Sequence, residues 1–348
     1  MNDKGYIVVT DYVQANTGAD VSDAIQKVID DNPHRTIFFP DGEYIIAKPI
    51  CTPADPAKAV SLELSSFATL RASDDWSSDE AMVRLGGKDA CNNIHLCGSN
   101  YYFRGGIVDG NKIAKGISID SGRETLITHV SIKNVSLGIH IKRGANNGSS
   151  DADIEKVNIT GNNMPDSIGV LVDGYDNTLH NMRIAAVQTG VWLRTAGNSL
   201  RDIHPLFIFG YEISEKDPSK YDNVDRIDYY KSVGFIDESN GNNWYDYCYS
   251  DQMATGFRFG RGKAAFFRCF TMWYSVRHDM EVGYDCTDEF NATISSGNVE
   301  LRADGKNRAY IKVAKEGGFG VIENPMFNPS SCDDDTYKKY LSGKIQGI

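Results

Sequence analysis

The sequence of 348 residues lacks any apolar run of the roughly 18 residues that a membrane-spanning helix needs. It is also poor in positive charge: 36 Lys and Arg stand against 47 Asp and Glu, a net charge of −11. Nucleic acid and anionic membranes are therefore not the expected partners. The segment Met1–Val9 has no apolar core of a signal peptide, so we expect a cytoplasmic protein unless an export signal has been removed.

Cysteine and proline are also scarce. The seven cysteines are an odd number, and their spacing fits neither a disulfide framework nor a structural zinc site, so we expect reduced, buried thiols and no metal or other cofactor. Ten prolines against 33 glycines suit a fold with many tight turns.

What the sequence does contain is a short repeat: a glycine, an apolar residue, a variable residue and a second apolar residue. A fixed period of about 22 residues that carries short strands predicts a solenoid in which each repeat forms one coil. Stacked coils lie about 4.8 Å apart, the ordinary spacing between strands. The copies begin at Gly116, Gly138, Gly169, Gly190, Gly210, Gly234 and Gly256.

Strand geometry places the two apolar residues of each copy on one face and the variable residue on the other. The inward positions are almost all aliphatic or aromatic, as a dry core requires, beginning with Ile117 and Ile119. A second strand is predicted before most copies, at 129–132, 156–159, 181–184, 202–204 and 246–249. The outward column reads Ser118, His140, Leu171, Trp192, Glu212, Ile236 and Arg258.

The N-terminal region predicts an amphipathic helix at 21–29, with Asp20 as its N-cap, followed by strands at 36–40 and 43–46. An amphipathic helix can cover the open end of a solenoid. This segment, TGADVSDAIQKVID through RTIFFPDGEYII, and the later GGIVDGN at 105–111 resemble the cap and coils of the pectate-lyase-type right-handed parallel β-helix superfamily.

The resemblance implies an all-β fold, a right-handed parallel β-helix of about 22 residues per coil with an N-terminal capping helix. We expect a cap and first coil at 1–50, the β-helix at 51–315 and a C-terminal cap or tail at 316–348. The superfamily includes lyases, glycosidases, transferases, epimerases and phage tailspikes, so the resemblance implies a carbohydrate partner. The motifs of polygalacturonases and calcium-dependent pectate lyases are absent.

Glycoside cleavage needs two carboxyl groups that flank the scissile bond. Glu212 is the leading candidate because it is the only carboxylate in the outward column between Ser118 and Arg258. Carboxylates on neighbouring coils fall within the separation that glycosidases use. The candidate partners of Glu212 are Asp202, Asp228, Asp246 and Asp251.

The predicted substrate-binding residues surround these carboxylates. Trp192 offers a flat apolar face for a sugar ring, and Arg258 can pair with a carboxylate or with sugar hydroxyls. The other predicted binding residues are His140, Arg183, His204, Tyr211 and Trp244. A further charged set, predicted to stack as a structural ladder, consists of Asp120, Lys142, Asp173 and Arg194.

The sequence therefore favours an enzyme that cleaves or rearranges a glycosidic bond with a pair of carboxylates. Two alternatives stay open: a lyase that acts on a uronic acid by β-elimination, and a glycan-binding, tailspike-like module without catalysis. Exposed apolar residues and the resemblance together favour a homo-oligomer, with a trimer preferred.

Overall fold

The computed structural model describes residues 5–89, 101–143, 149–207, 227–272, 281–301 and 308–342. Its contacts divide the chain into two compact units: Met1–Asn162 with Val170–Met182, and Asn163–Gly169 with Arg183–Ile348. The units divide within β17 (Ile168–Val172) and β18 (Thr178–Ala185). Boundaries at residues 50 and 315 remain a prediction.

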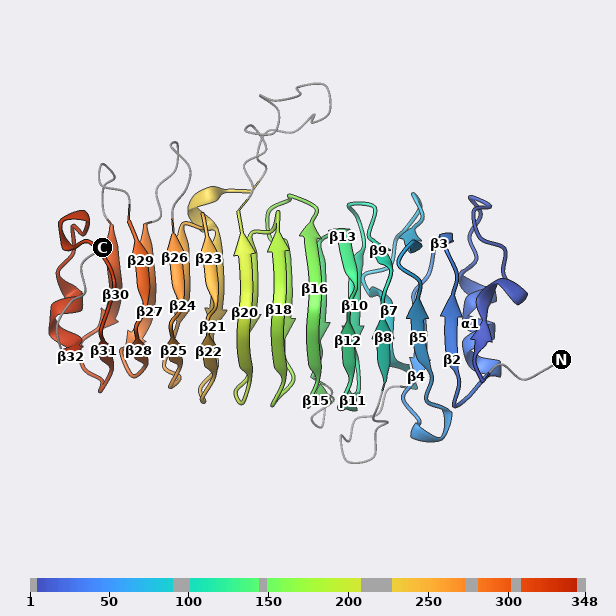
Figure 1. The fold of residues 1–348 in the computed structure, drawn as a ribbon, viewed down its shortest axis with the longest axis horizontal. Coiled ribbons are helices and arrows are strands. Elements are labelled where there is room, and N and C mark those ends of the chain that lie inside the picture. The colour runs from blue at the N-terminus through green and yellow to red at the C-terminus, as the bar shows by residue number, and fades with distance from the viewer. Residues whose placement is uncertain are drawn as a thin grey trace, which may run out of the picture. The chain divides into compact units, whose positions relative to one another are not determined.

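Three rows of parallel strands build the first unit (Figure 1). Strands that follow one another in the chain fall into rows one, two and three in turn, so the chain coils as a parallel β-helix. The first row contains β1 (Ile7–Val8), β2 (Thr36–Phe39), β5 (Ser61–Leu64), β8 (Tyr102–Arg104), β12 (Leu126–Thr128) and the start of β16 (Asp153–Gly161). The second row contains β3 (Gly42–Ile46), β6 (Ala68–Ala72), β9 (Ile107–Asp109), β13 (Ser131–Val135) and the end of β16. The third row contains β4 (Ile50–Pro53), β7 (Ala81–Lys88), β10 (Lys115–Ile119) and β14 (Leu137–Ile141).

The second unit repeats this arrangement (Figure 1). Its first row contains β20 (Ser199–Leu206), β22 (Trp244–Asp246), β25 (Ala265–Phe267), β28 (Thr293–Ser295), β31 (Val321–Glu323) and β32 (Leu341–Ser342). Its second row contains the end of β20, β23 (Tyr249–Asp251), β26 (Phe270–Met272) and β29 (Asn298–Glu300). Its third row contains β19 (Thr189–Leu193), β21 (Val233–Asp237), β24 (Thr255–Phe259), β27 (Val282–Glu289) and β30 (Ala309–Lys315).

Short elements join the rows. A small parallel pair lies in the first unit, β11 (Gly122–Arg123) with β15 (Ser149–Ser150). The 3₁₀ helices are η1 (Val9–Asp11), η2 (Pro56–Lys58), η3 (Tyr229–Lys231), η4 (Pro329–Ser331) and η5 (Thr336–Tyr340).

The predicted inward columns form the core of each unit. In the first, Ile117 pairs in register with Ile139, and both side chains are buried. In the second, the ring of Phe257 stacks between those of Phe235 and Tyr284, with centroid distances of 4.7 Å and 5.3 Å. In-register parallel pairing stacks like on like, which is why each inward column had to be apolar throughout.

The leading glycine of the motif is needed for space. A Cβ added to Gly116 would lie 2.5 Å from the carbonyl oxygen of Gly138 in the next coil. In the second unit, a Cβ on Gly234 would lie 2.7 Å from the carbonyl oxygen of Gly256. Real Cβ atoms do not approach backbone this closely, so a larger residue at these two positions would force the neighbouring coil to shift.

One step of the predicted outward column is wrong. Trp192 pairs directly with Ile236, 44 residues later (236 − 192), whereas Ile236 pairs with Arg258 after 22 residues (258 − 236). β19 and β21 are therefore direct neighbours, and the predicted order from Trp192 to the copy at Gly210 does not hold. Residues 208–226, with Tyr211 and Glu212, lie outside the described part.

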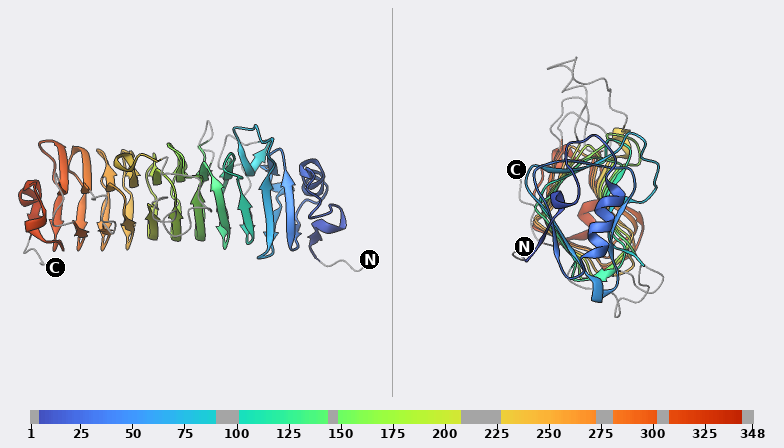
Figure 2. Two further views of the ribbon diagram at one scale, coloured as in Figure 1. Left: turned by 90° about the horizontal axis from the view of Figure 1, so that it is seen from above. Right: turned by 90° about the vertical axis from the view of Figure 1, so that its right-hand side faces the viewer.

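The predicted N-terminal helix is present as α1 (Ser22–Asp31), which buries Ile25, Val28 and Ile29. Its N-cap is Val21 rather than Asp20, whose carboxylate instead accepts a hydrogen bond from the Ser22 amide at 2.9 Å. Gln26 joins α1 to β4 through two hydrogen bonds to the backbone of Cys51 (2.8 and 3.0 Å). Figure 2 shows α1 in blue beside the first strands. Within the described ranges, no helix has the length and apolarity to cross a membrane.

Candidate functional site

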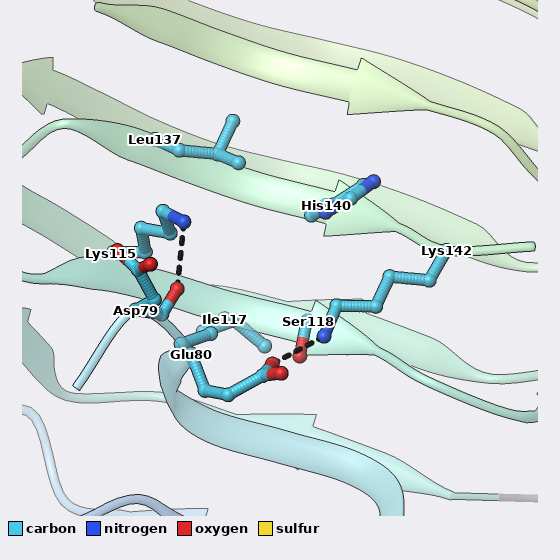
Figure 3. A pocket seen from close by; sticks show the side chains of 9 residues that line it. Asp79, Glu80, Lys115, Ile117, Ser118, Leu137, His140 and Lys142 are labelled. Atoms are coloured by element: carbon cyan, nitrogen blue, oxygen red, sulfur yellow. Dashed lines mark hydrogen bonds and ion pairs between the residues drawn. The ribbon is translucent and has the colours of Figure 1, made fainter.

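A pocket of about 250 Å³ opens on the outer face of the third row in the first unit (Figure 3). The variable position of the repeat points outward here, so Ser118 and His140 stand side by side in register. The other side chains come from the loop before β7 and from the ends of β10 and β14. The polar lining residues are Asp79, Glu80, Lys115, Ser118, His140 and Lys142.

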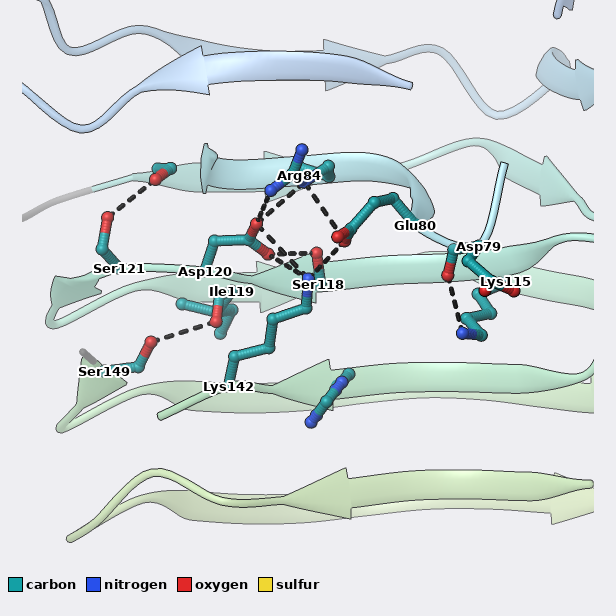
Figure 4. A network of polar contacts seen from close by, with 12 residues as sticks. Asp79, Glu80, Arg84, Lys115, Ser118, Ile119, Asp120, Ser121, Lys142 and Ser149 are labelled. Atoms are coloured by element: carbon teal, nitrogen blue, oxygen red, sulfur yellow. Dashed lines mark hydrogen bonds and ion pairs between the residues drawn. The ribbon is translucent and has the colours of Figure 1, made fainter. Parts of the chain in front are cut away.

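A network of charges forms one wall of this pocket (Figure 4). Arg84 Nε donates to Asp120 Oδ2 at 2.8 Å and lies 3.5 Å from Glu80 Oε2. Lys142 Nζ donates to Glu80 Oε2 and lies 3.4 Å from Asp120 Oδ1. The Ser118 hydroxyl donates to Asp120, and these neighbours leave only 4% of the Asp120 side chain exposed.

The two carboxylates of the network differ in exposure. Glu80 keeps 43% of its side chain exposed and lines the pocket, whereas only 4% of the Asp120 side chain is exposed. The hydrogen bond from Lys142 lowers the pKa of Glu80, against the opposing effect of partial burial. Glu80 is therefore ionised at neutral pH, where it can accept a proton or stabilise positive charge on a bound ligand.

His140 is the second proton-transfer group of the pocket. Its Nε2 lies 2.7 Å from Oδ2 of Asp173, and each side chain is only partly exposed. A carboxylate that holds an imidazole fixes its tautomer and orientation, the relation found between base and orienting group in catalytic triads. His140 can thus move a proton to or from a ligand that also contacts Glu80.

The sequence anticipated part of this site. His140 is a predicted binding residue, and Asp120 and Lys142 of the predicted ladder do lie next to each other. Glu80 and Arg84 were missed because the strand that holds Arg84 lacks the leading glycine: Met82 stands opposite Gly116. The pattern Val83-Arg-Leu85, apolar on both sides of a polar residue, was the available signal.

The predicted aromatic and basic residues of the outward column lie in the second unit. Trp192 Nε1 donates to Glu238 Oε2 at 3.0 Å, and the Arg194 guanidinium covers the indole ring at 4.4 Å from its centroid. Arg258 Nε donates to Asp285 Oδ2 at 2.8 Å. Arg183 is exposed on β18, and Trp244 is exposed on β22.

The four predicted partner carboxylates occupy different settings. Asp246 binds Arg268 with both oxygens, at 2.6 and 2.9 Å, and Asp202 Oδ2 lies 3.4 Å from Nε of Arg201. Asp228 accepts a hydrogen bond from the Tyr230 amide at the start of η3. Asp251 lies 3.4 Å from Nε2 of His204, whose ring stacks on that of Tyr249 at 4.0 Å. A catalytic role for these residues and for Glu212 remains a prediction.

Among the residues that the structure describes, no group of three His, Cys, Asp or Glu side chains is arranged to hold a metal ion.

Comparisons with known proteins agree with the fold. A tailspike protein double mutant of E. coli bacteriophage HK620 is 10% identical with a TM-score of 0.71, covering 99% of this chain and 65% of that chain. Another double mutant of that tailspike, in complex with pentasaccharide, is 11% identical with a TM-score of 0.61, covering 94% and 66%. The A-module of the Azotobacter vinelandii mannuronan C-5 epimerase AlgE6 is 12% identical with a TM-score of 0.51, covering 92% and 98%.

These identities show the fold alone. They confirm the parallel β-helix fold that the resemblance to the pectate-lyase-type superfamily implied, and no specific family is shown. No family model matches the sequence. No curated protein matches it. The chain spans just under two thirds of the length of the tailspike chains.

Proposed function

We propose that this protein is a carbohydrate-active enzyme that acts on an oligosaccharide bound over the third row of the first unit. The observation that carries the proposal is the pair of proton-transfer groups in one pocket, Glu80 and the His140 imidazole held by Asp173. The fold neighbours support a sugar ligand, since they include a tailspike in complex with pentasaccharide and a mannuronan epimerase.

The proposed roles follow from the charges. Glu80, ionised beside Lys142, accepts a proton or stabilises positive charge at the sugar's anomeric carbon, while His140 transfers a proton on the other side of the reacting bond. Asp173 is a positioning residue because it acts through His140. Lys115 and Lys142 are hydrogen-bond donors for sugar oxygens.

The test is product analysis by mass spectrometry after incubation with a panel of neutral and uronic oligosaccharides. We compare wild type with His140→Gln, Glu80→Gln and a control, Lys133→Gln, which is exposed on the second row. Loss of turnover by about 10²–10⁴-fold in the first two variants but not the control is expected for acid–base groups. Turnover that survives in both, and is lost in Asp246→Asn or Glu212→Gln, moves the site to the second unit.

Two other functions are favoured by specific observations. The cationic Lys115 and Lys142 could neutralise a uronate, as a β-eliminating lyase requires, and an unsaturated product absorbing in the ultraviolet identifies that reaction. The ion pairs that already engage Glu80 and Asp120 favour a glycan-binding module, which binds the panel with no product.

The coil geometry, the oligomeric state and the cellular location of the protein are also proposed. We propose right-handed coils of about 22 residues closed by α1, whose apolar face is buried. A homotrimer is favoured by the exposed aromatic side chains of Trp244, Tyr247 and Phe267, and sedimentation equilibrium tests it. A cytoplasmic location is kept as a proposal that fractionation of the native host tests.

A further inference from the structure

A second pocket, of about 430 Å³, lies on the first row of the first unit. Its lining side chains come from β2, β5, β8, β12 and β16, and its volume is within the range of about 300–1,000 Å³ typical of small-molecule sites. In register, Glu63 pairs with Arg104, Arg104 with Thr128, and Thr128 with Glu155. The four side chains therefore form one outward column.

The side chains of this column differ in whether they have polar partners. Glu155 accepts a hydrogen bond from the Thr128 hydroxyl at 3.1 Å and lies 3.3 Å from Nε2 of His180. Glu63 and Arg104, by contrast, stand on adjacent strands without an ion pair between them, and neither side chain has a hydrogen bond within the described ranges. Strands about 4.8 Å apart would allow such a pair, so both groups are available to a ligand.

An unpaired carboxylate beside an unpaired guanidinium favours a ligand that both donates and accepts hydrogen bonds. The carboxylate only accepts hydrogen bonds and the guanidinium only donates them, whereas a hydroxyl does both. Two neighbouring hydroxyls of a sugar can therefore donate to Glu63 and accept from Arg104 at once. The charges of Glu63 and Arg104 cancel, and the third charged group of the column, Glu155, is already engaged by Thr128 and His180, so neither an acidic nor an amino sugar is preferred.

The same strand supplies an apolar surface. Tyr102 lies two residues before Arg104, on the same face of β8, and is 39% exposed. It pairs in register with Leu126, which also lines the pocket. An aromatic ring beside an aliphatic side chain offers a platform for the C–H face of a pyranose.

We propose that the first row of the first unit carries a binding site for a neutral sugar residue, formed by Tyr102, Glu63 and Arg104. This site is separate from the proposed active pocket, because the two pockets share no lining residue and lie on different rows. It does not depend on the proposed catalytic function.

The test uses saturation-transfer difference NMR with methyl glycosides of glucose, galactose and mannose, and with their disaccharides. The strongest binder is then titrated calorimetrically into wild type, Tyr102→Ala, Arg104→Gln and Glu63→Gln. His140→Gln reports on the other pocket, and Lys133→Gln is the surface control. Circular dichroism tests whether each variant folds. If Tyr102→Ala fails to fold, Glu63→Gln still tests the site, because it keeps the shape of the replaced side chain.

The expected result is binding that weakens about tenfold or more in the three pocket variants, because a hydrogen bond to a charged group or an aromatic platform is lost. Lys133→Gln binds as wild type does. The proposal is overturned if no neutral sugar gives saturation transfer, or if glucuronate binds more tightly than glucose. It is also overturned if the pocket variants keep wild-type affinity or if the loss follows His140 alone.

Discussion

Replacing Asp120 with asparagine tests the buried charge of the network that adjoins the candidate active pocket. The substitution keeps the shape of the side chain but removes the carboxylate that Arg84 and Lys142 share. Lys142 retains its hydrogen bond to Glu80, so the main change falls on Arg84, whose side chain is only 23% exposed. A partly buried guanidinium then loses its closest negative partner.

The magnitude follows from burial. Breaking a fully buried pair by removing one partner costs about 3–5 kcal/mol. Arg84 keeps Glu80 at 3.5 Å and some access to water, so we expect a loss of about 2–3 kcal/mol. The matched control is Asp285→Asn in the second unit. Its partner Arg258 makes the same type of contact at 2.8 Å but is 37% exposed, so the expected loss is below about 1 kcal/mol.

The assay must be local, because a chain of two compact units need not unfold in one step. Native-state hydrogen exchange of the β10 and β14 amides reports the opening free energy near Asp120, and that of β24 and β27 reports the control. Adding Arg84→Met to Asp120→Asn should recover most of the loss, because no unpaired charge remains. Equal losses at Asp120 and Asp285, or an additive loss in the double variant, would refute the argument from burial.

Two further predictions concern the same row of strands. The lowered pKa of Glu80 means that its ion pair stabilises the fold above the unfolded pKa of about 4.3 and is lost as pH falls through the lower, folded one. Glu80→Gln should therefore lower the melting temperature at neutral pH and match wild type only once the pH is below the folded pKa. A shift that grows on acidification contradicts this sign. Gly116→Ala should cost about 1–3 kcal/mol by overpacking against the Gly138 carbonyl, whereas Gly260→Ala, whose nearest neighbour would be 3.5 Å away, should cost little in the same thermal melts.

The inward half of the structure was predictable from the sequence because it obeys strict physical limits. A column such as Phe235, Phe257 and Tyr284 must be apolar at every level, and a glycine such as Gly116 has no room for a Cβ. Both limits leave a visible pattern. The second strand predicted before most copies is present for the same reason, as in β13 and β18.

The outward half follows no such limit, and there the prediction failed in two opposite ways. The motif at Gly210 predicted a strand between β19 and β21, but these two strands pair directly with each other. The strand β7 is part of the row but lacks the glycine, because Met82 occupies that position. The first error favoured Glu212, and the second concealed Glu80 and Arg84.

The same freedom explains why the candidate chemistry lies on the outer face. In-register stacking brings together residues far apart in sequence: Lys142 bonds to Glu80, 62 positions earlier, and His140 to Asp173, 33 positions later. The core already fixes the coils, so outward side chains can change without cost to packing. A sequence pattern can therefore locate the columns, but which of their charges meet depends on the length of every loop between coils. The structure supplies these loop lengths and so shows which outward charges meet. Glu80 and His140 are therefore the first residues to mutate.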